Sequence, residues 1–521
     1  MFRTKVTEMS ALAGFVPAGK PANRRERFCS TRNSMKRIVD ALGKLDGGKR
    51  ACAVLVLCAT TAIALPAQTF TTLHSFCAQT NCRDGAGPNW LVQATNGNLY
   101  GITAGGGAYF DGSVYEIAPS GTLTPLDVFS GANNFPEGAL VLATNGDLYG
   151  TTYFGGANDG TVFKITPTGK LTTLYTFCSQ SGCPDGARPA AGLVLASSGN
   201  FSGTTQSTVF EITPGGTLTT LHSFDHNDGY WPGGALVQAT NGDFYGTTSE
   251  GGATIGSCEP PLGCGTVFKI TPSGTFTALY SFCLQNGCPD GTNPYAGLVQ
   301  ATNGDFYGTT SQGGANGGGT VFKITPTGTL TTLYNFCSQS NCTDGKYPYA
   351  ALVQATDGNF YGTATYGGNG FVDGFTGGGT VFEMTPGGTL TTLYSFCAQS
   401  GCTDGESPYA GLFQATNGTF YGTTELGGAN GQGTVFSLSL GLGPFVETQT
   451  TSGKAGAVVK ILGTDLTGAT SVSFNGTAAV FKVVSSSLIT TKVPAGATTG
   501  EVEVVTPSGT LSSNVPFRVR P

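Results

Sequence analysis

The stretch GTVFKITPTGTLTTLYNF, residues 319–336, decides the fold. Both halves are rich in β-branched and aromatic residues, and the Pro-Thr-Gly turn between them predicts an antiparallel hairpin. Just upstream, an Asn-Gly turn at 303–304 separates two further β-rich runs and predicts a second hairpin. The unit is therefore four antiparallel strands, expected at residues 296–300, 305–310, 319–325 and 329–336.

This unit recurs seven times. The Gly-Thr-Val-Phe signature or a variant of it starts at residues 112, 160, 207, 265, 319, 379 and 433, so the period is 47 to 60 residues. A four-stranded repeat of that length is typical of a β-propeller blade. The missing 3.6-residue periodicity excludes helical solenoids, and the missing nine-residue period excludes a repeat-type β-helix.

The phase of the copies predicts how the propeller closes. Residues 69–76 form a fourth strand with no first three before it, and residues 433–438 form a third strand with no fourth after it. Pairing the two fragments gives seven complete blades and hides the sheet edges. The long loops, between strands two and three and between blades, then share one face, which is the expected functional face because binding residues usually lie on loops.

The charge of the chain limits its partners. Residues 68–521 hold 13 Lys and Arg against 27 Asp and Glu, a formal charge of −14. Such a chain repels phosphate backbones and anionic lipid, so we expect no nucleic-acid partner.

The N-terminal 67 residues are predicted to be a targeting segment. An apolar run at 51–65 follows Lys49-Arg50 and ends in small residues, which predicts a signal peptide too short to span a membrane. The 50 residues before it are unusually many, so we expect the true start at Met35. The mature chain is then secreted, extracellular or attached to the cell surface, with no membrane span, and is expected to be a monomer.

Twelve cysteines follow residue 67 and fall into local pairs. In an oxidising compartment such pairs favour disulfides, and a zinc site lacks interleaved histidines. The predicted disulfides are Cys77–Cys82, Cys178–Cys183, Cys258–Cys264, Cys283–Cys288, Cys337–Cys342 and Cys397–Cys402.

No catalytic motif is present: there is no nucleophile elbow, HExxH or phosphate loop. His74 and His222 occupy a strand position that is Tyr in other repeats, which indicates repeat variants. His226, beside Asp225 and Asp228, is the one candidate for metal or acid–base chemistry.

Two sets of residues on the loop face are candidate ligand-binding residues, and each has a structural alternative. Each acid precedes Gly, so the structural interpretation is that it forms part of a turn. The functional interpretation is a ring of carboxylates that binds Ca²⁺, another cation or a polyhydroxyl ligand; no cofactor is predicted. The aromatic residues pack between blades or stack on a ligand. The acids are Asp84, Asp185, Asp228, Asp290, Asp344 and Asp404; the aromatic residues are Trp90, Tyr230, Trp231, Tyr295, Tyr349 and Tyr409.

The repeats, from the GTVFKITP signature to AGLVQATNGDFYGTT, resemble the GloVer ("choice-of-anchor") repeats of secreted bacterial proteins. The C-terminal part, with ILGTDL at 461–466 and VSFNG at 472–476, resembles an IPT/TIG domain, which implies an immunoglobulin-like β-sandwich used as a structural or interaction module. The expected domains are 1–67 (signal segment), 68–440 (seven-bladed propeller), 441–444 (linker) and 445–521 (IPT/TIG domain).

We therefore expect a non-catalytic binding or scaffold protein whose propeller face recognises a glycan or a protein. An extracellular carbohydrate-active hydrolase or lyase using loop carboxylates such as Asp228 is one alternative. A purely structural envelope protein without a ligand is the other.

Overall fold

The computed structural model describes residues 68–129, 135–156, 159–252, 258, 263–369, 371–372 and 375–520. These residues belong to one compact unit, Gln68–Pro521. The predicted signal peptide, the start at Met35 and Cys29, Cys52 and Cys58 lie outside the described residues.

The fold is all-β. In the described part the helices are three single 3-10 turns: η1 (Thr80–Cys82), η2 (Ser340–Cys342) and η3 (Ser400–Cys402). Residues 69–439 form seven four-stranded antiparallel sheets that resemble propeller blades, together with a small hairpin, β24 (Phe371–Val372) and β25 (Phe375–Thr376). No helix in these described ranges is long and apolar enough to cross a membrane.

Six of the sheets are made from four strands that follow one another along the chain, apart from the inserted hairpin. Their strands are β2 (Ala86–Gln93), β3 (Leu99–Gly105), β4 (Ser113–Ile117), β5 (Leu123–Val128); β6 (Val141–Leu142), β7 (Leu148–Thr152), β8 (Thr161–Ile165), β9 (Leu171–Thr176); β10 (Val194–Leu195), β11 (Phe201–Thr204), β12 (Thr208–Ile212), β13 (Leu218–Ser223); β14 (Val237–Gln238), β15 (Phe244–Thr248), β16 (Thr266–Ile270), β17 (Phe276–Ser281); β18 (Val299–Gln300), β19 (Phe306–Thr310), β20 (Thr320–Ile324), β21 (Leu330–Asn335); β22 (Val353–Gln354), β23 (Phe360–Ala364), β26 (Thr380–Met384) and β27 (Leu390–Ser395).

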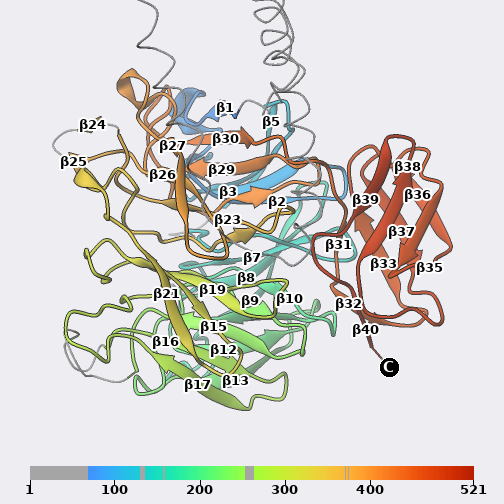
Figure 1. Ribbon diagram of the computed structural model, residues 1–521, viewed down its shortest axis with the longest axis horizontal. Coiled ribbons are helices and arrows are strands. Elements are labelled where there is room, and N and C mark those ends of the chain that lie inside the picture. The colour runs from blue at the N-terminus through green and yellow to red at the C-terminus, as the bar shows by residue number, and fades with distance from the viewer. Residues whose placement is uncertain are drawn as a thin grey trace, which may run out of the picture. The chain divides into compact units, whose positions relative to one another are not determined.

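The seventh sheet joins the two ends of the repeat region. Strand β1 (Thr69–Ser75) pairs antiparallel with β30 (Thr434–Ser439), which continues to β29 (Phe420–Thr424) and β28 (Phe413–Gln414). Figure 1 shows blue β1 beside orange β30. This is the pairing that the phase of the repeats predicts.

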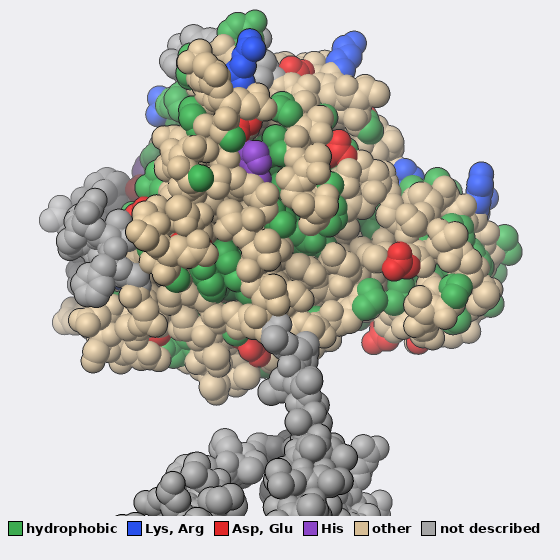
Figure 2. Space-filling view, turned by 90° about the horizontal axis from the view of Figure 1, so that it is seen from above, with side chains coloured by type: hydrophobic (Ala, Val, Ile, Leu, Met, Phe, Trp, Pro, Cys, Tyr) green, Lys and Arg blue, Asp and Glu red, His purple; other side chains and the backbone are tan. Residues whose placement is uncertain are grey.

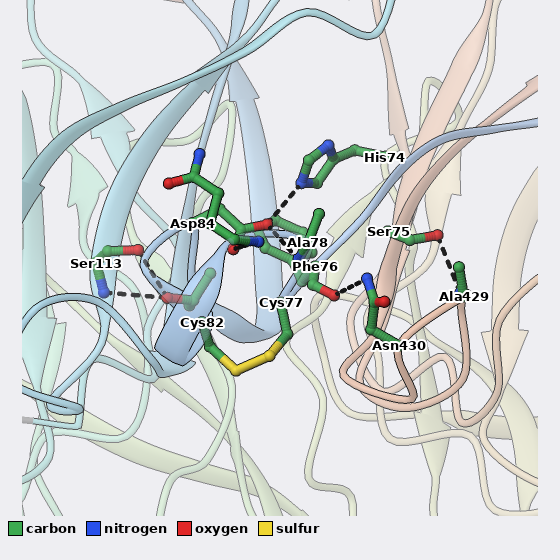
Figure 3. Close-up of polar contacts among 12 residues, drawn as sticks. His74, Ser75, Phe76, Cys77, Ala78, Cys82, Asp84, Ser113, Ala429 and Asn430 are labelled. Carbon is green, nitrogen blue, oxygen red and sulfur yellow. Dashed lines mark hydrogen bonds and ion pairs between the residues drawn. A yellow bond between two sulfur atoms is a disulfide. The ribbon is translucent and has the colours of Figure 1, made fainter.

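Loop contacts repeat across this joint as they do within a continuous sheet. Phe76 donates its backbone N–H to the Gly433 carbonyl at 3.0 Å, and Asn430 Nδ2 donates to the Phe76 carbonyl at 3.0 Å (Figure 3). Two bonds of the same kind occur in the β18–β21 sheet, from Phe336 N to the Gly319 carbonyl and from Asn316 Nδ2 to the Phe336 carbonyl. Strand β1 thus fills the place of an ordinary fourth strand.

The core lies between the sheets. Seven clusters of buried side chains each join one four-stranded sheet to the next, and one of them joins the sheet of β1 to the sheet of β2. A glycine in the second strand of each sheet makes room for an aromatic ring. A Cβ at Gly308, for example, would lie 2.6 Å from the Phe322 ring. The Phe-Tyr-Gly-Thr-Thr signature is therefore a packing motif.

The C-terminal strands form two further four-stranded sheets around a separate core that includes Val459, Ile489 and Phe517. One sheet is β31 (Glu447–Thr448), β33 (Val458–Leu462), β37 (Leu488–Lys492) and β36 (Phe481–Ser485); the other is β35 (Thr477–Ala478), β34 (Ser471–Phe474), β38 (Val502–Thr506) and β39 (Gly509–Ser512); β32 (Ser452–Lys454) pairs in parallel with β40 (Arg518–Arg520).

These C-terminal sheets contact the repeat region through its tight-turn ends. Ser487 Oγ donates to the Thr95 carbonyl at 2.8 Å, and Arg520 donates to the Ser197 carbonyl at 3.2 Å. Leu462 and Leu488 join the buried cluster of the first two sheets. The C-terminal sheets thus contact the repeat region at the turns that join first and second strands.

Candidate functional site

The six repeated acids are held inside their own loops. In the loop after β27, Asp404 is fully buried and accepts hydrogen bonds from the Tyr394 hydroxyl at 2.8 Å and the Ala398 N–H at 3.0 Å. Asp84 has the same arrangement with His74 Nε2 at 3.2 Å (Figure 3). Equivalent contacts join Tyr175 to Asp185, His222 to Asp228, Tyr280 to Asp290 and Tyr334 to Asp344.

These contacts explain two features of the repeat. His74 and His222 take the place of Tyr as hydrogen-bond partners of the loop acid, in agreement with the prediction that they are repeat variants. The carboxylates act in each loop as acceptors for its backbone and for the neighbouring strand. None of the six acids lines the cavity described below.

All six predicted cysteine pairs are disulfide-bonded. In the five Cys-x4-Cys loops both cysteines have positive φ, as at Cys337 (60°) and Cys342 (53°), a region that side chains other than Gly rarely adopt. The covalent link therefore holds a turn that the backbone alone disfavours. Within the described residues, the two groups of side chains that could hold a metal both contain disulfide-bonded cysteines.

A cavity of about 580 Å³ lies among the first strands of several sheets. Its wall is built mostly of small and apolar side chains from the segments that precede or form β2, β6, β10, β14 and β18. Residues 449–451, next to β31, line it near Ser197 and Gln238, where first strands end. Trp90, Tyr295 and Glu137 line it where these segments begin, at the loop face.

Four of the six predicted aromatic residues meet in this cavity. Trp90, Tyr295, Tyr349 and Tyr409 all line it, and they come from four different sheets. The Tyr349 and Tyr409 rings stack at 5.1 Å, and the Tyr295 ring lies 6.0 Å from Tyr349 and 6.3 Å from Tyr409. Burial raises the pKa of Tyr295 to about 12, so its hydroxyl stays protonated at neutral pH.

The other two predicted aromatic residues lie outside the cavity lining. Tyr230 stacks on His226 with ring centroids 4.0 Å apart, and the Trp231 carbonyl accepts a hydrogen bond from Ser249 Oγ at 2.9 Å. Tyr230 thus packs within its own loop, whereas the Trp231 backbone bonds to Gln206 and Ser249 of other loops.

Two carboxylates that sequence reasoning did not select line the same cavity. Desolvation, followed by the nearby charge of Glu425, raises the pKa of Glu137 to about 7. Glu425 is exposed, and partial desolvation raises its pKa as well. No ion pair in the described part of the chain involves either residue.

The signal for both carboxylates is a break in the repeat. Glu137 stands near the position where other repeats carry an aromatic residue at the start of the first strand. Glu425 follows the Phe-Tyr-Gly-Thr-Thr signature where Ser249 and Ser311 use their hydroxyls to bind the backbone of the adjacent loop. Departures from a repeat, more than its shared residues, mark this cavity.

Comparison with protein families identifies the repeat. The Gloeobacter/Verrucomicrobia repeat model matches residues 59–208, 186–372 and 257–479, which together span most of the chain. The chain belongs to the Gloeobacter/Verrucomicrobia repeat family. An IPT/TIG domain matches residues 444–519, as the sequence predicted.

The solved structures that are similar to this chain share little sequence identity with it. A streptogramin B lyase has 14% identity and a TM-score of 0.47, covering 73% of this chain and 99% of its own. A gluconolactonase from Xanthomonas campestris has 11% identity and a TM-score of 0.37, covering 73% and 92%. PorZ of Porphyromonas gingivalis has 15% identity and a TM-score of 0.43, covering 82% and 58%. No curated protein sequence shows significant similarity.

Proposed function

We propose that the chain is a secreted, surface-associated binding protein in which a closed seven-bladed propeller, residues 68–440, recognises a glycan through its central cavity. A linker at 441–444 joins the propeller to an immunoglobulin-like domain at 445–521. The pairing of β1 with β30 and the seven clusters that link successive sheets support the closed ring. The disulfides support an oxidising, extracellular location.

The observation that carries the binding proposal is the meeting of Trp90, Tyr295, Tyr349 and Tyr409 in one cavity. Ligand sites are concave and mostly apolar, with a few polar groups that fix orientation. Aromatic faces provide flat apolar surfaces for a sugar ring, and tyrosine hydroxyls and carboxyl groups provide hydrogen-bond partners. The cavity volume lies within the usual range for small-ligand pockets.

The IPT/TIG domain contributes to the cavity in this proposal. Residues 449–451 line it at the end remote from the loop face, so a ligand enters from the loop face. The domain therefore does more than space the propeller from a surface: it forms one end of the binding site.

A glycan array probed with residues 68–521 tests the proposal. We expect binding to a restricted set of glycans without product formation, and loss of that binding in Tyr349→Ala. The matched control is Tyr109→Ala, which removes a tyrosine that is 60% exposed and lies outside the cavity lining. Binding that survives Tyr349→Ala, or that Tyr109→Ala removes equally, would contradict the assignment of the cavity. The absence of any glycan signal would favour the purely structural alternative.

One observation favours the enzymatic alternative. Glu137, with a pKa near 7, and Glu425 form a pair of carboxyl groups of the kind that general acid–base chemistry uses. The predicted loop acid Asp228 is bonded to His222 and lies outside the cavity, so a hydrolase or lyase would use the two glutamates. Release of reducing ends or unsaturated products that Glu137→Gln abolishes would establish this function in place of simple binding.

A further inference from the structure

The cavity combines aromatic rings with two carboxyl groups that form no ion pair with any described residue. The rings of Tyr295, Tyr349 and Tyr409 lie within 6.3 Å of one another, and Trp90 lines the same space. The face of each ring carries the negative part of its quadrupole, which attracts a cation within about 6 Å of the ring centroid. Walls of this kind are typical of sites for organic cations.

Charge at the cavity has one sign. Glu137 and Glu425 are the charged side chains that line it within the described residues, and neither takes part in an ion pair. Elsewhere charged side chains are few and scattered, as the face in Figure 2 shows. An anionic ligand would be repelled, and a neutral ligand that covered the two carboxyl groups would give them no counter-charge.

We propose that the cavity selects ligands that carry an organic ammonium group, which lies against the tyrosine rings and pairs with Glu137 and Glu425. This inference deepens the proposed binding function and rests on it. On a glycan, an amino sugar supplies such a group. A trimethylammonium head group is a second source of the same chemistry.

The protonation of the acids supports this choice. Burial and the charge of Glu425 raise the pKa of Glu137 to about 7, so a proton partly neutralises this pair at neutral pH. An ammonium group can replace that proton. The titratable neighbours Tyr153, Tyr295 and Tyr409 have raised pKa values and stay neutral, and Arg188 interacts with Tyr153. Binding should therefore release a proton near pH 7.

A hard metal ion fits the cavity less well. Ca²⁺ takes six to eight oxygen ligands, and the side chains that line the cavity include two carboxyl groups, with amide and hydroxyl groups such as Gln238 and Thr450 among a mostly apolar lining. The groups of described side chains that could hold a metal include neither Glu137 nor Glu425. Large, weakly hydrated organic cations suit aromatic walls better.

Two probes of equal shape test the inference. Choline and 3,3-dimethyl-1-butanol differ only in the charged nitrogen, and their affinities for residues 68–521 are measured at pH 8 by titration calorimetry or NMR. We expect choline to bind at least about tenfold more tightly. Glu137→Gln should remove most of that preference, whereas Glu501→Gln, which neutralises an exposed carboxylate outside the cavity, should retain it.

Comparison of deacetylated with N-acetylated chitotriose then shows whether an amino sugar supplies the ammonium group. Equal binding of choline and its neutral analogue, no binding of either up to about 100 mM, or a preference that Glu137→Gln leaves intact overturns the inference. If the glycan array shows binding but any of these results is obtained, the proposed glycan-binding function still stands and only the ammonium inference fails. If the array shows no glycan binding either, the proposed function fails as well.

Discussion

The loop acids and the cavity acids differ in how often they recur along the chain and in what surrounds them. Asp404 and its five counterparts recur with the repeat and accept hydrogen bonds from a strand residue and the loop backbone. Glu137 and Glu425 occur once each, break the repeat, line the cavity and have pKa values that desolvation raises. Repeated polar residues hold the loops of this fold together, and the two unrepeated acids line the cavity that we propose as the binding site.

The largest effect should come from removing a whole repeated element. Deletion of residues 68–77 removes β1 and leaves β30 as an exposed edge, so we expect the melting temperature to fall sharply. Thermal unfolding followed by circular dichroism measures the change. A synthetic peptide of residues 68–77 should restore part of the loss, whereas unchanged stability would show that the sheet pairing is dispensable.

Removal of one repeated acid should be the next largest effect. Asp404→Ala removes a buried carboxylate and leaves the Tyr394 hydroxyl and two backbone N–H groups without their acceptor, which should cost about 2–4 kcal/mol of unfolding free energy. Denaturant titration measures this cost. The exposed Asp225 of another loop is the control, and Asp225→Ala should cost clearly less. Equal costs would mean that burial and hydrogen bonding of the repeated acid contribute little.

The cavity acid should act on stability in the opposite direction. The pKa of Glu137 is about 7 in the folded state, above the ordinary Glu value. Between about pH 4.5 and 7 the folded state therefore keeps a proton on Glu137 that the unfolded state has already lost. Stability should therefore fall as pH rises through this window. Glu137→Gln should reduce the fall by about 2 kcal/mol, after allowance for partial solvent screening.

Glu447 is the matched comparison for that experiment. Desolvation raises its pKa to about 7 too, but it lies outside the cavity lining. Glu447→Gln should flatten the pH dependence of the unfolding free energy in the same way without changing ligand binding. A pH profile that neither substitution alters would contradict the raised pKa values.

The smallest effect concerns the end of the cavity formed by the IPT/TIG domain. Both polar side-chain atoms of Gln449 are buried without a hydrogen-bond partner. Because buried unpaired amides are costly, Gln449→Leu should leave the unfolding free energy unchanged or raise it by up to about 1 kcal/mol. A loss above about 1 kcal/mol would show that this amide has a stabilising partner.

Much of the fold was readable from the repeat. The turn residues predicted the strands, the phase of residues 69–76 and 433–438 predicted that β1 pairs with β30, and the cysteine spacing predicted six disulfides. Strand pairing and local loops depend on short-range patterns, which a sequence displays directly.

The cavity was only partly readable. Tyr295, Tyr349 and Tyr409 were predictable because they share a repeat position, and Trp90 because it enters the first strand of its own sheet. Tyr230, near the same position, packs on His226 instead. Glu137 was visible as an exception in the aromatic series, but its pairing with Glu425, from sheets far apart in sequence, depends on how the sheets are arranged. Residues 449–451 reach the cavity from another domain, which no repeat pattern indicates.

Paired measurements on Asp404→Asn and Glu137→Gln test the central claim most directly. Each variant is assayed for its melting temperature and for its affinity for the strongest glycan of the array at pH 8. We expect Asp404→Asn to lower the melting temperature and keep the affinity, and Glu137→Gln to keep or raise the melting temperature and weaken binding at least about tenfold. The reverse pattern, with binding lost at Asp404 and untouched at Glu137, would contradict the division between structural and functional acids.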